Sequence, residues 1–167
     1  MPKNNTKNNT ILVLEDEDEL LADLFDQLES ETSSEFDVLG ASQPRDANSV
    51  VPRRRVHTRR HKSAAEFEKV FESMVSHGTH FPVFIGDLRM EGDDGQMDSE
   101  RGLHTALRVR SLDPRINIVI VTARVDVDAS ELCSKIGGKT YFMKRPYNPA
   151  AFVDLVVRLV DDWNEGR

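Results

Sequence analysis

The stretch Val83-Phe84-Ile85-Gly86-Asp87 decides the fold, because a short apolar run leads directly into one carboxylate. Three other runs end in the same way: Ile11–Leu14 before Glu15-Asp16, Ile118–Val121 before Thr122-Ala123, and Tyr141–Met143 before Lys144. Short β-branched runs between helical patterns are typical of buried parallel strands. Ligand sites in open α/β sheets lie outside the carboxyl ends of the strands. We therefore expect these polar groups to converge on one surface.

The intervals between the runs show helical periodicity. The chain has 167 residues, a length that suits one domain. Strand and helix alternate five times, which predicts a doubly wound α/β domain with right-handed crossovers. The predicted domain covers 11–163, between a disordered polar tail at 1–10 and a short tail at 164–167. The predicted helices are 17–30, 64–76, 102–112, 126–136 and a last one opened by Pro149, and a second strand is predicted at 36–41.

Two charged segments interrupt this pattern. Residues 43–62 carry a formal charge of +6, so the rest of the chain, whose total is −7, carries −13. This segment is predicted to be an exposed basic loop, and its arginines suit either solvent or an acidic partner surface. It lacks the interleaved aromatic residues that stack on bases, and the net charge also argues against nucleic-acid binding. Residues 91–101 are predicted to form an extended acidic loop.

Several protein classes are excluded by what the sequence lacks. No run is long enough to span a bilayer, and residues 1–10 contain no apolar signal segment. The single cysteine, Cys133, cannot form an internal disulfide, which favours the cytoplasm. No Walker A or G-x-G-x-x-G motif is present, and Arg89 stands where haloacid-dehalogenase-like phosphatases have their second Asp. We therefore do not expect an enzyme.

The converging side chains suit phosphoryl transfer. Asp87 is the candidate nucleophile, since a carboxylate can attack phosphorus to form an aspartyl phosphate. Glu15 and Asp16 supply hard oxygen ligands for Mg²⁺ beside it. Lys144 offers a positive charge, and the Thr122 hydroxyl can donate to a phosphoryl oxygen. Each residue alone also suits a turn, a helix cap or the solvated surface, so the joint pattern is the specific signal.

This set resembles the active site of response regulator receiver domains of two-component signalling, of the chemotaxis-receiver type. The resemblance covers Ile11 to about Trp163 and implies a flavodoxin-like five-stranded parallel sheet of order 2-1-3-4-5 with helices on both faces. It implies Mg²⁺ held by Asp16, Asp87 and the backbone carbonyl of Arg89, with Glu15 acting through water. It also implies that Tyr141 is an aromatic switch that turns inward when Thr122 moves. The motifs that carry it are Glu15-Asp16, Asp87-Leu88-Arg89-Met90, Asp94-Gly95, Thr122-Ala123 and Lys144.

The sequence departs from the family at three places. The family's Lys is usually followed directly by a cis-prolyl bond, whereas here Arg145 stands between Lys144 and Pro146. Either Arg145 replaces that proline, or one residue is inserted. Glu91 replaces a frequent proline, and Gln96–Gly102 adds residues before the third helix.

The expected function is a stand-alone phosphoacceptor. Its partners would be a sensor histidine kinase or histidine phosphotransfer protein and a downstream effector, with no membrane contact, and nothing in the sequence excludes a dimer. The alternative is an interaction module on the same fold that works without phosphorylation, with the basic residues 45–62 as one route to an acidic partner or nucleic acid.

Overall fold

The computed structural model describes residues 10–14, 37–41, 64–92 and 94–167. The helix predicted at 17–30 and the basic segment 43–62 lie outside these ranges. The strands are β1 (Thr10–Leu14), β2 (Asp37–Ala41), β3 (Val83–Gly86), β4 (Met90–Glu91), β5 (Met97–Asp98), β6 (Asn117–Thr122) and β7 (Thr140–Lys144). The helices are α2 (Ala64–Ser76), α3 (Arg101–Leu112), α4 (Ala129–Ile136) and α5 (Pro149–Asn164).

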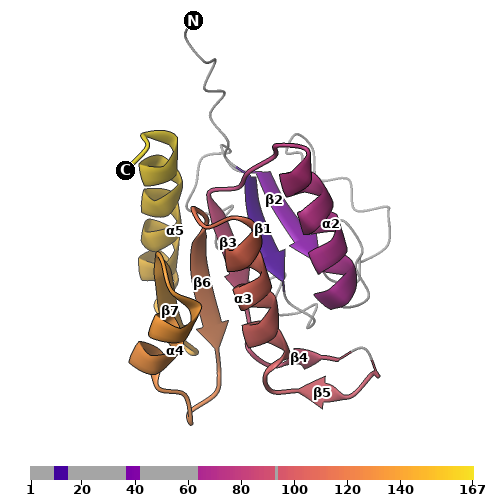
Figure 1. Cartoon of the computed structure of the whole chain (residues 1–167). Helices are drawn as coiled ribbons and strands as arrows, with labels where there is room; N and C mark the ends of the chain where they lie inside the picture. The colour runs from indigo at the N-terminus through magenta and orange to yellow at the C-terminus, as the bar shows by residue number, and fades with distance from the viewer. Residues whose placement is uncertain (1–9, 15–36, 42–63, 93) are drawn as a thin grey trace, which may run out of the picture.

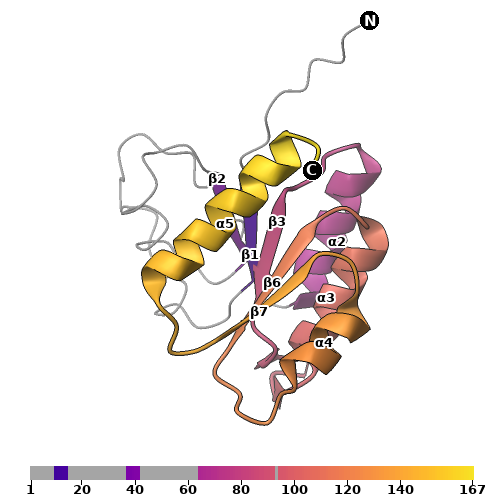
Figure 2. The same cartoon turned by 90° about the vertical axis from the view of Figure 1, so that its left-hand side faces the viewer.

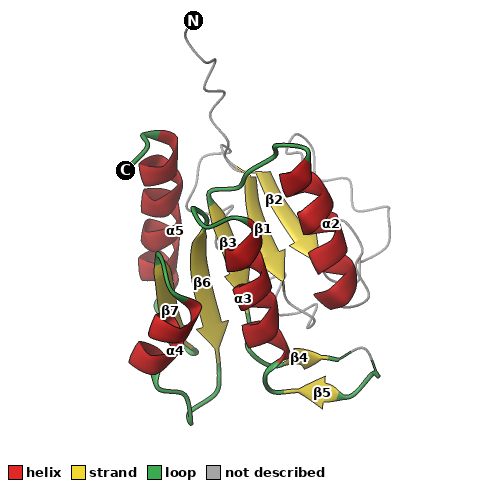
Figure 3. Cartoon of the chain, viewed as in Figure 1, coloured by secondary structure: helices red, strands yellow, loops and turns green. Residues whose placement is uncertain are grey.

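Five of the strands form one parallel sheet in the order β2-β1-β3-β6-β7 (Figures 1 and 3). The predicted α/β class with a parallel sheet is therefore confirmed, and the strand order is the predicted one. The register sets Leu14 opposite Gly86, and Thr122 opposite Lys144. Because all strands run in one direction, their carboxyl ends meet at one edge, the lower edge in Figure 1.

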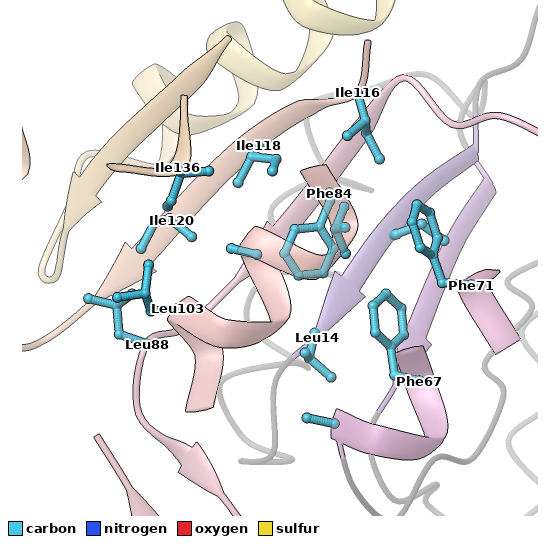
Figure 4. Close-up of a cluster of buried hydrophobic side chains, with 14 of the residues drawn as sticks. Leu14, Phe67, Phe71, Phe84, Leu88, Leu103, Ile116, Ile118, Ile120 and Ile136 are labelled. Atoms are coloured by element: carbon cyan, nitrogen blue, oxygen red, sulfur yellow. The ribbon is translucent and has the colours of Figure 1, made fainter. Parts of the chain in front are cut away.

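Helices cover both faces of this sheet. Helix α5 packs on one face, while α2, α3 and α4 lie on the other (Figure 2). Each face has its own hydrophobic cluster, because alternate residues of a buried strand point to opposite sides. Along β6, Ile118 and Ile120 join the larger cluster of Figure 4, whereas Val119 and Val121 join the cluster under α5. None of the described helices is both long and apolar enough to cross a bilayer.

The structure adds detail to two predicted segments. The segment predicted as an acidic loop at 91–101 contains most of a small antiparallel hairpin, in which β4 pairs with β5. The turn of this hairpin contains Gly95, whose φ of 76° favours glycine. At the other end of the chain, α5 continues through Asn164, and the Arg167 guanidinium pairs with Asp162 and Glu165. Residues 165–167 are thus held against the last helix.

Candidate functional site

Asp87 stands at the carboxyl edge of the sheet, directly after β3. Its side chain is only 11% exposed. The backbone N–H groups of Leu88 and Arg89 both donate to its Oδ1, at 2.5 Å and 3.3 Å. These two bonds fix the orientation of the carboxylate, because both donors belong to the turn that leaves the strand. The other oxygen, Oδ2, faces away from this turn toward a cation.

That cation is Arg145. Its Nη1 lies 3.5 Å from Asp87 Oδ2, and the Arg145 side chain is 13% exposed. The backbone N–H of Arg145 donates to the Thr122 carbonyl at 2.8 Å, which anchors the residue beside the end of β6. The peptide bond between Arg145 and Pro146 is cis. The site therefore holds a guanidinium against the candidate nucleophile.

Lys144, the cation predicted from the sequence, is placed differently. It is the last residue of β7 and is exposed, and its ammonium has no ion pair within the described part of the chain. Sequence analysis missed Arg145 because Lys144 ends the apolar run. The available signal was that Arg145, not Lys144, directly precedes the proline, as the family's lysine does.

Thr122 lies where it was predicted, but Tyr141 does not face it. Thr122 ends β6 with 1% exposure, and its Oγ1 accepts a hydrogen bond from the Arg124 N–H at 3.3 Å. By the alternation along β6, Thr122 belongs to the face of Ile118 and Ile120, whereas Tyr141 packs against the cluster under α5. The aromatic residue of β7 on the Thr122 face is Phe142, which packs against the larger cluster. Thr122 and Tyr141 thus lie on opposite faces of the sheet in this structure, and the inward turn of Tyr141 when Thr122 moves stays a prediction.

The predicted acidic pair, Glu15 and Asp16, lies outside the described residues. Among the described residues, no three His, Cys, Asp or Glu side chains gather into a group that could hold a metal ion. The pairing of β1 with β3 nevertheless shows where the two acidic segments of the predicted magnesium site begin. Leu14 pairs with Gly86 in parallel strands, and the next residue along the sequence is Glu15 after one and Asp87 after the other.

Gly102 lets the first turn of α3 approach the backbone that carries Asp87. A Cβ at this position would lie 1.8 Å from the Asp87 carbonyl oxygen, and the Gly102 N–H donates to the Leu88 carbonyl at 2.9 Å. Gly95, the glycine of the Asp94-Gly95 motif, lies instead in the hairpin turn. Because the hairpin adds residues to this loop, the close-packed glycine occurs later in the sequence.

We expect Gly102→Ala to destabilise the fold by about 1–3 kcal/mol, the usual cost of overpacking a filled site. The cost opposes the helix propensity of alanine, which by itself would stabilise α3. Urea unfolding followed by circular dichroism measures the change. His104→Ala is the control, because His104 is exposed on the same helix. A Gly102→Ala protein as stable as the parent would contradict the close approach.

Arg124 joins the loop after β6 to the start of α3. Its Nε and Nη2 donate to the two carboxylate oxygens of Asp126, at 3.1 Å and 2.6 Å. Its Nη1 donates to the Ser99 carbonyl at 2.8 Å and lies 3.4 Å from Glu100 Oε1. Hydrogen bonding to Asp126 raises the pKa of Arg124 above its usual value, and the same bond lowers the pKa of Asp126. The loop that begins at Thr122 is thus tied to the hairpin side of the site.

Comparison with solved structures identifies this arrangement of strands and helices. A receiver domain protein from Methanospirillum hungatei JF-1 superposes with a TM-score of 0.63 at 15% identity, covering 96% of this chain and 99% of its own. A response regulator receiver protein from Sinorhizobium medicae WSM419 gives 0.60 at 21% identity, covering 93% and 96%. The chain has the receiver-domain fold. The signal receiver domain of a modulated diguanylate cyclase from Desulfovibrio desulfuricans G20 also matches, with a TM-score of 0.61, 16% identity and coverage of 95% and 97%.

The likeness is one of fold. No protein-family model matches the sequence, and a search of curated proteins finds no match. On the receiver fold of this chain, Asp87, Thr122 and Arg145 gather at the carboxyl edge of the sheet, which is where an open α/β sheet places its ligands. What this site does must be argued from its own side chains.

Proposed function

We propose that the protein is a response regulator receiver that accepts a phosphoryl group on Asp87. The observation that carries the proposal is the Asp87 carboxylate, 11% exposed, facing the Arg145 guanidinium at 3.5 Å, at the carboxyl edge of a receiver fold. A carboxylate held by two backbone N–H groups is oriented for attack. The cation beside it offsets the charge of an incoming phosphoryl group.

The reaction is a phosphoryl transfer from a donor to the Asp87 carboxylate. A carboxylate oxygen of Asp87 attacks phosphorus, and a new O–P bond forms. The P–N bond to a phosphohistidine, or the P–O bond to a small acyl phosphate, breaks, and its electron pair leaves with the donor. Arg145 pairs with the transferred group, and the buried Thr122 hydroxyl, whose oxygen already accepts one N–H, donates its hydrogen to a phosphoryl oxygen. Such catalysis is mostly positioning and charge neutralisation.

The predicted ligands are of the chemical type that binds a magnesium ion. Asp87 supplies a carboxylate, the backbone carbonyl of Arg89 is the predicted neutral ligand, and Glu15 and Asp16 complete an all-oxygen set of the type that Mg²⁺ prefers. The register of Leu14 with Gly86 supports a shared cation, because it starts the two acidic segments from neighbouring positions. When bound, the ion would neutralise charge on the phosphoryl oxygens.

The experiment is labelling of the full chain with radioactive acetyl phosphate, with and without Mg²⁺. We expect one phosphoryl group per chain, lost on treatment with hydroxylamine, which cleaves acyl phosphates. Removal of Mg²⁺ with EDTA is expected to lower the labelling rate at least tenfold, since repulsion between the acidic residues and the donor would return. Ca²⁺ added in place of Mg²⁺ controls for simple charge screening. Labelling that survives hydroxylamine would contradict an aspartyl phosphate.

A sensor histidine kinase or a histidine phosphotransfer protein is the proposed donor, and a downstream effector protein is the proposed target. Adding phosphate changes the charge at the edge of the sheet, and Thr122 connects this edge to the loop that Arg124 holds. The outward signal would therefore pass through this loop to a protein surface. The cytoplasmic location expected from the sequence fits these partners and stays a prediction.

A second candidate function is an interaction module that works without phosphorylation. The Asp87–Arg145 ion pair favours it, because this pair neutralises the carboxylate in the structure as it stands. The two candidates differ in one measurement. An interaction module would bind its effector equally well after Asp87→Ala, whereas a phosphoacceptor would lose the dependence of binding on the phosphoryl donor.

A further inference from the structure

A groove lies between the first turns of α3 and α4, beside the site and distinct from its acceptor carboxylate. Its volume is about 240 Å³. Its apolar lining includes Leu88, Leu103 and Leu132, which are 2%, 5% and 7% exposed. This volume is below the roughly 300–1,000 Å³ of pockets that hold small molecules. The groove therefore suits a single large side chain better than a cofactor.

The rim of the groove is acidic. Four carboxylates and two cations line it. Arg124 is already paired with Asp126 and Glu100. Asp128 and Glu131 have no ion pair within the described part of the chain, and only Lys135 remains to offset them. The groove thus presents uncompensated negative charge around an apolar floor.

The surface beside the groove is also acidic and also carries exposed apolar side chains. The described residues of this segment, 88–92 and 94–100, include four acidic residues and one basic residue. Met97 and Val125 are the two large hydrophobic side chains that the described residues expose, at 47% and 80%. They lie in segments joined by the Arg124–Ser99 hydrogen bond, at the carboxyl edge of the sheet (Figure 1). Exposed apolar groups rimmed by charge are typical of protein contact sites.

We infer that this groove docks a partner protein through a basic segment that carries one large apolar side chain. The apolar side chain would enter between Leu103 and Leu132, and flanking lysines or arginines would face Asp128 and Glu131. Charge complementarity decides the occupant, because a neutral or acidic segment would leave these carboxylates unpaired. The inference does not depend on phosphorylation of Asp87, so it can hold or fail independently of the proposed function.

The test uses the unphosphorylated full chain and a fluorescent peptide of sequence GRKSFKRG, in which Phe is the single large apolar side chain. We expect binding by fluorescence anisotropy, NMR shifts at Leu103, Val127 and Leu132, and weakening at higher salt. Glu131→Lys should raise the Kd about fivefold, since exposed charge pairs each contribute up to about 1 kcal/mol. Asp154→Lys is the matched control, because Asp154 is an exposed acid of α5 on the opposite face. It should change the Kd by less than about twofold.

Each of the following outcomes would overturn the proposal. Equal binding of GRKSSKRG would show that no apolar side chain is seated. NMR shifts confined to another face would place the contact elsewhere. An unchanged Kd in Glu131→Lys would show that the acidic side chains around the groove do not contribute to binding. Sedimentation showing salt-sensitive dimers that cover Leu132 would assign the groove to a second copy of the chain.

Discussion

Asp87→Asn is expected to reduce phosphoryl labelling by acetyl phosphate to background. The amide nitrogen and oxygen of asparagine are much poorer nucleophiles than a carboxylate, so no stable phosphorylated product forms. The substitution is nearly isosteric, and the asparagine Oδ1 can still accept the N–H groups of Leu88 and Arg89. The fold should therefore persist. Labelling measured beside a thermal melt separates loss of chemistry from loss of structure.

Asp98→Asn is the matched control for this experiment. Asp98 is a carboxylate of the neighbouring hairpin, and its Oδ1 also accepts a backbone N–H, from Glu100 at 2.8 Å. The control should label at the parent rate. Full labelling of Asp87→Asn, or loss of labelling in Asp98→Asn with Asp87 intact, would move the acceptor to another residue.

The sequence predicted correctly those parts of the fold in which the apolar pattern is compatible with only one kind of buried element. Val83–Gly86 is apolar at every position and is buried at every position, since this strand lies in the interior of the sheet with a neighbour on each side. The helix predicted at 64–76 is observed with those bounds, because Phe67 and Phe71 recur at helical spacing and both are buried. Period and burial agree in these segments.

The hairpin β4–β5 could not be predicted in this way. Its strands are two residues each and its sequence is mostly polar, so no period of two can be recognised. The hairpin also affects which glycine packs beside Asp87. The glycine that packs against the Asp87 backbone is Gly102 and not Gly95 of the family motif, and only the backbone distance to Asp87 shows this.

The cation that pairs with Asp87 could not be identified from the sequence for a related reason. Lys144 and Arg145 are adjacent cations at the end of one strand, and sequence alone does not tell which side chain turns inward. In the structure, Lys144 is exposed, whereas Arg145 is mostly buried against Asp87. An arginine differs from a lysine here, since its planar guanidinium can donate two parallel hydrogen bonds to a phosphoryl group.

Arg145→Gln is expected to slow labelling of Asp87 by acetyl phosphate about 10²-fold, the usual effect of removing one preorganised donor for developing charge. The variant removes the only cation seen on Asp87 among the described residues. Arg145→Lys keeps the charge but loses the planar pair of donors, so its rate should fall between those of Arg145→Gln and the parent. Initial labelling rates at saturating Mg²⁺ provide the measurement.

Lys144→Gln decides between the two adjacent cations. Because Lys144 is exposed and unpaired within the described residues, its loss should change the labelling rate by less than about threefold, the screened effect of one surface charge. A thermal melt of each variant checks that the fold is kept. The reverse result, a large loss in Lys144→Gln with little change in Arg145→Gln, would restore the lysine to the phosphoryl group. The Asp87–Arg145 contact would then be a structural ion pair.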